Sequence, residues 1–173
     1  AYSLLRTVMG QAVRDRKVTV NPCPVAGAGR ASRKRKIRTA SPAELVTIAQ
    51  NMPEHLRLLV LLAGWCGLRF GELAELRRGD VDTDRELLSV SRALVRVDGR
   101  DIIGPPKSEA GVREIHIPPH LMPAVVDHLA EHVGPGPAAL VFPRRPGDER
   151  HLIHTEVTKT YRRAREAAGR PDL

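Results

Sequence analysis

The sequence GWCGLRFGEL, residues 64–73, decides how the rest of this 173-residue chain is interpreted. It follows the almost wholly apolar run Leu56–Ala63, which is typical of a helix buried on all sides. Gly67 stands where a left-handed helix cap is expected, and Gly71 allows another segment of backbone to come close. One fixed cation, Arg69, lies between these glycines at the end of the most hydrophobic part of the chain.

A guanidinium in that position is costly to desolvate unless it meets an anion. Two interpretations of Arg69 are open. In the structural one, Arg69 pairs within the protein with Glu72 or Glu75. In the functional one, its five-donor fork is available to bind a phosphate group of a ligand.

The residues around Arg69 carry a family resemblance. GLRFGEL at residues 67–73, followed by Leu76 and by DVD at residues 80–82, resembles the first arginine box of the tyrosine recombinases, the phage integrase family. The resemblance implies that Arg69 is catalytic and clamps the phosphate at which DNA is cut. Arg78 departs from the pattern, because the family often has an aromatic residue there, and this leaves the local packing open.

The balance of charge favours a polyanionic partner. Arginine supplies 23 of the 28 basic residues, and the formal net charge is +8. Arg binds phosphate in a bidentate geometry, so double-stranded DNA is the partner we expect, and a basic surface without a partner is the alternative. Only 3% of the residues are aromatic, which argues against a surface that stacks unpaired bases.

Several other classes of protein are excluded by motif. The sequence has no glycine loop that cradles phosphate and no dinucleotide fingerprint, so we expect no nucleotide cofactor and no small-molecule substrate. His128 and His132 have the spacing of a metal-ligand pair, but no third ligand is near, so we expect no metal. Cys23 and Cys66 predict reduced thiols. No apolar run reaches the roughly 18–20 residues that span a bilayer, so we expect a soluble, cytoplasmic protein with no membrane partner.

The chain divides into three parts by pattern. Residues 1–17 form an amphipathic helix without an N-terminal cap, and residues 1–23 resemble the C-terminal helix of the integrase core-binding, SAM-like domain. Residues 24–39 are expected to be a basic interdomain linker, for which a nuclear-localisation signal is the alternative. Residues 40–173 are expected to be the N-terminal part of the catalytic domain. The linker residues expected to contact DNA phosphates are Arg33, Lys34, Arg35, Lys36 and Arg38.

The overall prediction is an α+β fold, a mostly helical catalytic-domain fragment with a small three-stranded antiparallel sheet at one side. Ser41, Pro42 and Glu44 predict a helix start with a capping box. Further helices are expected over residues 53–67, 72–76, 120–133 and 154–168, the last capped by His154 or Thr155. Strands are expected around residues 88–90, 94–97, 102–103 and 112–117, with a turn at residues 98–99. In the last strand Arg113 shares a face with Ile115 and Ile117, so that face is neither all core nor all solvent.

The loop at residues 104–111 carries one lysine, Lys107, which by itself reads as an ordinary solvated side chain. However, PKS at residues 106–108, followed by GVR and IHIP, resembles the sheet segment of the recombinases, in which a hairpin lysine reaches the leaving 5′-oxygen. The resemblance implies that Lys107 is the general acid, because a departing alkoxide needs a proton. Glu72, one turn after Arg69, is expected either to orient a catalytic side chain or to cap backbone N–H groups.

The end of the chain bears on activity. Residues 161–173 resemble the helix and turn that precede the His-x-x-Arg box of the family, so that box and the nucleophilic tyrosine are expected to follow. The resemblance implies a site-specific recombinase, bacterial or phage-encoded and nucleoid-associated. It would cut and rejoin duplex DNA through a 3′-phosphotyrosine as a homo-oligomer, a tetramer on DNA. This chain alone, with only Tyr2 and Tyr161 as phenols, is expected to bind DNA weakly and to be catalytically incomplete. The alternative is a non-catalytic duplex-DNA-binding module with a recombinase-like fold.

Overall fold

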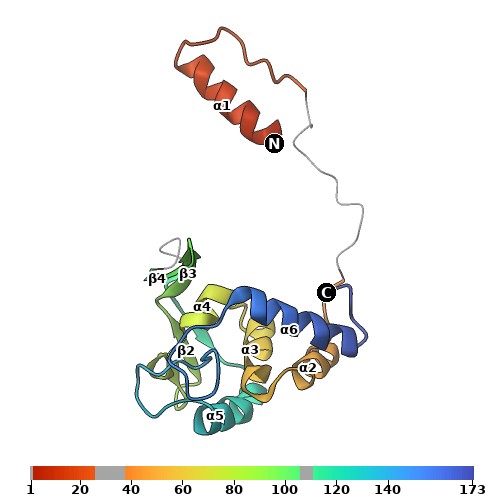
Figure 1. The fold of residues 1–173 in the computed structure, drawn as a ribbon, viewed down its shortest axis with the longest axis vertical. Helices are drawn as coiled ribbons and strands as arrows, with labels where there is room; N and C mark the ends of the chain where they lie inside the picture. Colours follow the sequence, from red (N-terminus) through yellow and green to blue (C-terminus); the bar gives the residue numbers. More distant parts are fainter. Residues whose placement is uncertain (1, 26–37, 106–110) are drawn as a thin grey trace. The chain divides into compact units, whose positions relative to one another are not determined.

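The computed structural model describes residues 2–25, 38–105 and 111–173 (Figure 1). The chain divides into two compact units, Ala1–Arg38 and Thr39–Leu173. The larger unit contains most of the helices and all the strands that the structure describes. None of the helices in these residue ranges is long and apolar enough to cross a lipid bilayer.

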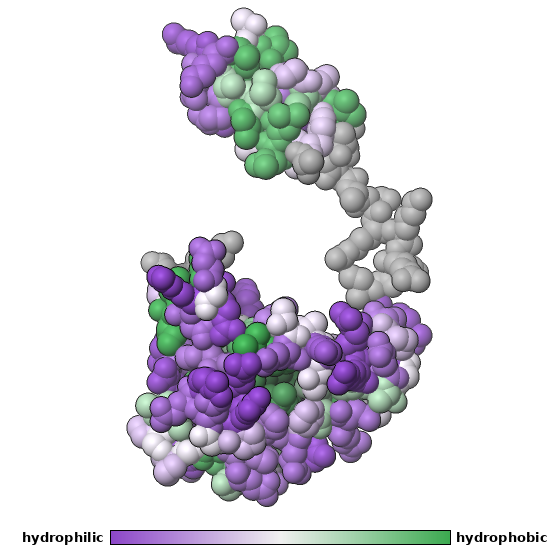
Figure 2. Space-filling model, viewed as in Figure 1, coloured by the Kyte–Doolittle hydropathy of each residue, from purple (hydrophilic) through white to green (hydrophobic). Residues whose placement is uncertain are grey.

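The smaller unit is built on helix α1 (Tyr2–Arg14), which ends three residues earlier than the sequence predicted. The segment that follows folds back on the helix, because the Asn21 side-chain amide donates a hydrogen bond of 3.0 Å to the carbonyl oxygen of Arg6. The backbone N–H of Val25 also donates to the Tyr2 hydroxyl, at 2.9 Å. No residue of α1 is buried, and Leu4, Leu5 and Val8 are exposed, so hydrophobic side chains lie at the surface of this unit (Figure 2).

Four helices frame the larger unit: α2 (Pro42–Gln50), α3 (Glu54–Trp65), α5 (Met122–Glu131) and α6 (His154–Ala167). The predicted capping box is confirmed. The Ser41 hydroxyl accepts from the N–H of Glu44 at 3.3 Å, and the Glu44 carboxylate accepts from the N–H of Ser41 at 2.7 Å. A Cβ atom on Gly64 would overlap the side chain of Leu45, so α2 and α3 pack closely at this point.

The cap predicted for α6 is wrong. Both His154 and Thr155 lie inside the helix, and the N-cap position belongs to Ile153, which offers no side-chain hydrogen bond. The predicted end of α6 is correct, because Gly169 has a φ of +73°. Short 3-10 turns over Arg78–Asp80 (η1) and Pro119–Leu121 (η3) connect the larger elements.

Helix α4 (Phe70–Glu75) carries the deciding sequence and begins two residues earlier than predicted. Gly67 adopts a φ of +64° just after α3, which confirms the predicted left-handed cap. Gly71 lies against the backbone of residue 94, which confirms the predicted close approach. Both glycines are therefore used to bring Arg69 to the start of α4.

The predicted antiparallel strands form two sheets. Strands β1 (Val81–Asp82), β2 (Leu87–Val90) and β5 (Arg113–His116) make the three-stranded sheet, in the order β1-β2-β5. Strands β3 (Ala93–Val97) and β4 (Arg100–Gly104) form a separate hairpin. The predicted small three-stranded antiparallel sheet is therefore confirmed, but its strands are not all the expected ones: residues 94–97 and 102–103 belong to the separate hairpin, and β1 was not predicted as a strand.

The hairpin turn itself is confirmed. Asp98 and Gly99 both have positive φ values, +49° and +76°, as a two-residue turn between antiparallel strands requires. On one face of the hairpin, Val95, Val97 and Ile102 are exposed, whereas Leu94 on the other face is buried against the body of the unit.

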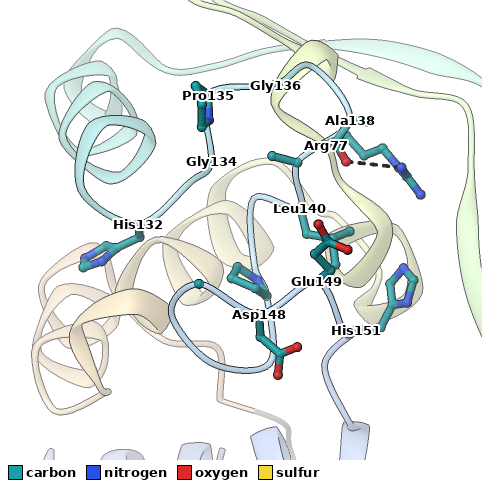
Figure 3. A pocket seen from close by; sticks show the side chains of 13 residues that line it. Arg77, His132, Gly134, Pro135, Gly136, Ala138, Leu140, Asp148, Glu149 and His151 are labelled. Carbon is teal, nitrogen blue, oxygen red and sulfur yellow. Dashed lines mark hydrogen bonds between the residues drawn. The ribbon is translucent and has the colours of Figure 1, made fainter.

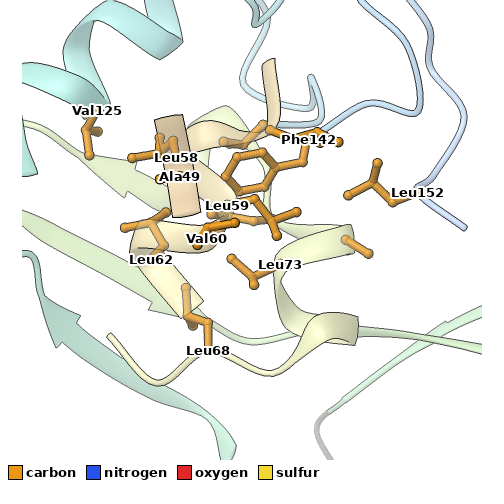
Figure 4. Close-up of a cluster of buried hydrophobic side chains, with 14 of the residues drawn as sticks. Ala49, Leu58, Leu59, Val60, Leu62, Leu68, Leu73, Val125, Phe142 and Leu152 are labelled. Atoms are coloured by element: carbon orange, nitrogen blue, oxygen red, sulfur yellow. The ribbon is translucent and has the colours of Figure 1, made fainter. Parts of the chain in front are cut away.

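The hydrophobic core surrounds α3, in which Leu58, Leu59, Val60 and Leu62 are buried (Figure 4). Other elements complete this core with Ala49, Leu68, Leu73, Val125, Phe142 and Leu152. The run Leu56–Ala63 is thus mostly buried, as predicted, although Leu61 and Ala63 are half-buried and Arg57 is exposed. This core fixes the end of α3 and the start of α4, and so the place of Arg69.

Candidate active site

Arg69 occupies the N-cap position of α4, with extended backbone angles of φ −75° and ψ 154°. Its backbone N–H donates to one oxygen of the Glu72 carboxylate at 2.9 Å, and its Nη1 donates to the other at 3.1 Å. The Arg69 side chain is nevertheless 76% exposed, whereas the Glu72 side chain is 2% exposed. Glu72 therefore holds Arg69 at the surface rather than drawing it into the protein.

A second guanidinium reaches Glu72 from the sheet. Arg113, the first residue of β5, donates from Nη1 to Oε1 at 3.1 Å and from Nη2 to Oε2 at 2.9 Å. This is the bidentate fork that suits a carboxylate. Arg113 is not among the site residues predicted from the sequence. The mixed character of its face of β5 was the one signal that pointed to it.

The Glu72 carboxylate is ionised in this arrangement. Burial by itself raises the pKa of the Glu72 carboxyl, but hydrogen bonds from Arg113 and from Arg69 outweigh burial, and the pKa lies below its ordinary value. The same hydrogen bonds to Glu72 raise the pKa of Arg113. Two cations and one anion leave a net charge of about +1, and Arg69 presents it to solvent.

The structure bears on the structural interpretation of Arg69, whereas its binding to a phosphate stays a prediction. Arg69 pairs with Glu72, as the structural interpretation requires, but among the described residues its guanidinium hydrogen-bonds to Glu72 alone. The alternative partner, Glu75, is occupied elsewhere. The capping role predicted for Glu72 is confirmed, because its carboxylate accepts from the Arg69 backbone N–H; it also accepts from the Arg69 guanidinium, and the catalytic role of that contact stays a prediction.

Glu75 is the centre of a second buried charge cluster. Its side chain is fully buried and accepts from Nε of Arg77 at 2.7 Å and from Nε2 of His151 at 2.6 Å. Nε of Arg92 lies 3.6 Å away, and Nη2 of Arg92 pairs with Asp80 at 2.6 Å. No local pattern in the sequence indicates this cluster, because His151 lies 76 residues after Glu75.

Arg77 and His151 also line a pocket of about 570 Å³ (Figure 3). This pocket lies between the segments 134–140 and 143–151, and Arg77 donates across it to the carbonyl of Ala138 at 3.2 Å. The pocket also contains Asp148, where hydrogen bonds from Arg150 lower the pKa of the carboxyl to about 2. Neither Arg69 nor Glu72 lines this pocket. The guanidinium of Arg69 lies instead at the exposed surface of the unit.

The remaining predicted site residues are placed as follows. Arg38 is exposed. Lys107 and the linker residues Arg33, Lys34, Arg35 and Lys36 lie outside the described residues.

No group of three His, Cys, Asp or Glu side chains suited to a metal ion occurs within residues 2–25, 38–105 and 111–173. The His128 and His132 rings lie 5.2 Å apart in a T-shaped contact, and Nε2 of His128 is hydrogen-bonded to the Val141 carbonyl at 2.8 Å. A packing role accounts for this pair.

The chain resembles known integrases in sequence. It is 48% identical over 173 residues to the putative prophage phiRv2 integrase of Mycobacterium tuberculosis, a match that covers 100% of this chain and 46% of the relative. The integrase of Mycobacterium phage D29 is 34% identical over 177 residues, with the same shares covered. A tyrosine recombinase XerC-like protein of Caldanaerobacter subterraneus is 30% identical over 73% of the chain and 36% of that relative. The chain therefore spans about half the length of its relatives, or less.

Solved structures show the same fold. The Tn1549 transposon integrase in complex with transposon right end DNA superposes with a TM-score of 0.75 at 22% identity, over 94% of this chain and 55% of that one. The lambda integrase (75–356) dimer bound to a COC′ core site gives 0.59 at 22% identity, over 97% and 56%. No protein-family model matches the chain. On the sequence relatives and the shared fold together, the chain belongs to the tyrosine recombinase family, among the integrases of phages and prophages.

Proposed function

We propose that this chain is part of a site-specific DNA recombinase of the phage integrase type, which cuts and rejoins duplex DNA through a 3′-phosphotyrosine. The main support for the proposal is the Arg69 turn, in which Arg69 at the N-cap of α4 pairs with Glu72 in the first turn of that helix. An exposed guanidinium, fixed at its base by a buried carboxylate, is suited to hold a phosphate of DNA while the opposite side of the group stays with the protein.

In this proposal Arg69 stabilises the charge that develops on the non-bridging oxygens of the scissile phosphate. Lys107 protonates the departing 5′-oxygen, and Glu72 positions Arg69. The linker cations Arg33, Lys34, Arg35, Lys36 and Arg38 neutralise backbone phosphates beside the site. The solved structures of the Tn1549 and lambda integrases in complex with DNA support the proposal of a double-stranded DNA partner.

We propose further that the polypeptide of residues 1–173 cuts nothing by itself. The Tyr2 hydroxyl accepts a hydrogen bond from the Val25 N–H, and the half-buried Tyr161 ring packs against the core from α6. These contacts give each phenol a structural role within its own unit, which supports the proposal. A full-length integrase with this region is proposed to act in the bacterial cytoplasm as a homo-oligomer, a tetramer on DNA. A non-catalytic DNA-binding module remains the alternative function.

One substitution in a full-length integrase that contains this region tests the proposal. Arg69→Ala removes a group that stabilises the transition state, so the rate of DNA cleavage should fall about 10²–10³-fold. The protein should stay folded, because the Arg69 side chain is mostly exposed. Cleavage is measured on a nicked suicide substrate as covalent protein–DNA adduct. An unchanged rate in Arg69→Ala would favour the non-catalytic module.

A further inference from the structure

We infer that Arg113 is a positioning residue that keeps Arg69 available to phosphate by occupying Glu72. The inference rests on the proposed function of Arg69 and adds a residue that the proposal does not include. Arg113 would set the balance between two states of the Arg69 side chain. In one state Arg69 points outward to an anion, and in the other it pairs fully with Glu72.

The Glu72 carboxylate accepts as many hydrogen bonds as its two oxygens allow. A carboxylate offers about four lone-pair sites on its two oxygens. Oε2 accepts from the Arg69 backbone N–H and from Nη2 of Arg113, while Oε1 accepts from Nη1 of Arg69 and from Nη1 of Arg113. The capacity of Glu72 is therefore filled, and Arg113 takes half of it.

Arg69 and Arg113 compete for the Glu72 carboxylate. Arg69 donates only one guanidinium N–H to Glu72, because the bidentate position belongs to Arg113. Without Arg113, the buried carboxylate would lose two charge-assisted hydrogen bonds, and the cation nearest to it would be Arg69. The Arg69 fork would then turn onto Glu72, and the site would lose both its outward guanidinium and its net positive charge.

The third contact of Arg113 links the site to the neighbouring loop. Nη1 of Arg113 also donates to the Gly111 carbonyl at 3.0 Å. Gly111 is the first described residue after the segment that contains Lys107. One guanidinium thus fixes the start of β5 and, through Glu72, the Arg69 turn of α4.

The structure offers a matched control. The Arg144 side chain is 27% exposed, close to the 28% of Arg113, and it also makes a bidentate pair with a carboxylate, that of Glu156. Glu156 is 53% exposed and touches neither Arg69 nor Glu72. Arg144→Gln therefore removes a comparable ion pair without touching the proposed competition.

The first test follows the Arg69 side chain by NMR in the chain of residues 1–173. Hydrogen exchange of the Arg69 guanidinium protons should slow in Arg113→Gln, because these protons become paired with Glu72, and should be unchanged in Arg144→Gln. Exchange that is equally fast in wild type and Arg113→Gln would overturn the inference. This measurement needs no recombinase activity.

The second test uses a full-length integrase with this region. Arg113→Gln should lose up to about 10²-fold in cleavage rate, approaching the loss in Arg69→Ala. Glu72→Gln added to Arg113→Gln removes the competing charge, so it should restore cleavage about tenfold if the two residues act as one unit. Arg113→Lys, which keeps the charge but lacks the fork, should fall between wild type and Arg113→Gln.

The outcomes separate two kinds of failure. A structural role alone for Arg113 predicts that cleavage tracks thermal stability and that the second substitution brings no recovery, and that result would overturn the inference. If Arg69→Ala itself leaves cleavage unchanged, the proposed function of Arg69 is wrong, and the NMR comparison still decides the role of Arg113.

Discussion

A Cβ atom on Gly71 would lie 2.5 Å from the carbonyl oxygen of Leu94. Real side chains do not come this close to a backbone oxygen, so α4 and β3 pack together with backbone against backbone. The contact fixes the base of the β3–β4 hairpin beside the turn that carries Arg69. It also makes the position of the hairpin dependent on the absence of a single methyl group.

Gly71→Ala should therefore destabilise the larger unit by about 1–3 kcal/mol, the usual cost of overpacking, because the backbone of Leu94 has to move. The free energy of unfolding is measured by urea denaturation. Gly104→Ala is the control within the hairpin, since a Cβ atom there meets nothing within 4 Å. Equal stabilities for the two variants would contradict the proposed close contact.

Glu75→Gln, which removes a buried negative charge, should destabilise the larger unit more than the loss of an exposed charge does. The substitution leaves Arg77 and the 14%-exposed His151 without their buried anion, and breaking a buried pair costs about 3 kcal/mol. Glu156→Gln breaks an exposed pair with Arg144 and should cost about 0–1 kcal/mol. Chemical denaturation of both variants checks the difference, and a cost below that of Glu156→Gln would refute the assigned role of Glu75.

The buried His128 should make the protein sensitive to acid. Burial, and to a smaller extent the neighbouring His132 and His55, lowers the pKa of His128 below its ordinary value of 6.5, although the hydrogen bond to Val141 acts in the opposite direction. The unfolded chain therefore binds more protons than the folded one between the lowered pKa and 6.5, so stability is full above pH 6.5 and falls as pH falls through that window.

His128→Gln, which keeps an N–H donor for the Val141 carbonyl but does not titrate, should flatten this loss of stability. Thermal unfolding midpoints measured from pH 5 to 8 would show it. His116→Gln, at an exposed position on β5, is the control and should leave the profile unchanged. The idea fails if the acid dependence of His128→Gln equals that of wild type.

DNA binding by this chain should be weak, nonspecific and dependent on salt. Each phosphate neutralised contributes about 0.9 to the slope of log affinity against log salt concentration. Neutralising Arg33, Lys34, Arg35 and Lys36 together should flatten that slope. Fluorescence anisotropy with an arbitrary duplex measures it, and an affinity independent of salt would rule out the electrostatic account.

The role of Lys107 can be isolated by changing the substrate. In a full-length integrase with this region, Lys107→Ala should be rescued by DNA with a 5′-bridging thiolate, because that better leaving group needs no proton. Arg69→Ala should not be rescued by the same substrate, since it acts on the non-bridging oxygens. Absence of rescue in Lys107→Ala would exclude Lys107 as the general acid.

Local features of the fold were predictable from the sequence. The Ser41 capping box, the Gly67 cap and the turn at residues 98–99 each depend on a few adjacent residues whose backbone preferences are strong. The Gly71 contact was predictable in kind, but its partner was not. The separation of β3 and β4 from the three-stranded sheet was not predictable, because strand pairing depends on contacts between distant segments that no local pattern indicates.

Long-range charge pairs were the main part of the site that the sequence did not reveal. Arg113 reaches Glu72 across 41 residues, and His151 reaches Glu75 across 76. Arg78 shows the same limit, because its place in a position that is often aromatic gave no hint of its partner. Its Nη1 donates to the Leu129 carbonyl at 2.8 Å near the end of α5, a contact across 51 residues that no local pattern indicates.

The separation of Glu72 from Arg113 also has a consequence for how the protein is made. During synthesis on the ribosome, α4 emerges before β5, so for a period the Glu72 carboxylate lacks its bidentate partner. The Arg69 turn therefore has its full set of hydrogen bonds only when β5 has paired with β2, so the local order at Arg69 depends on a strand that is made 41 residues later.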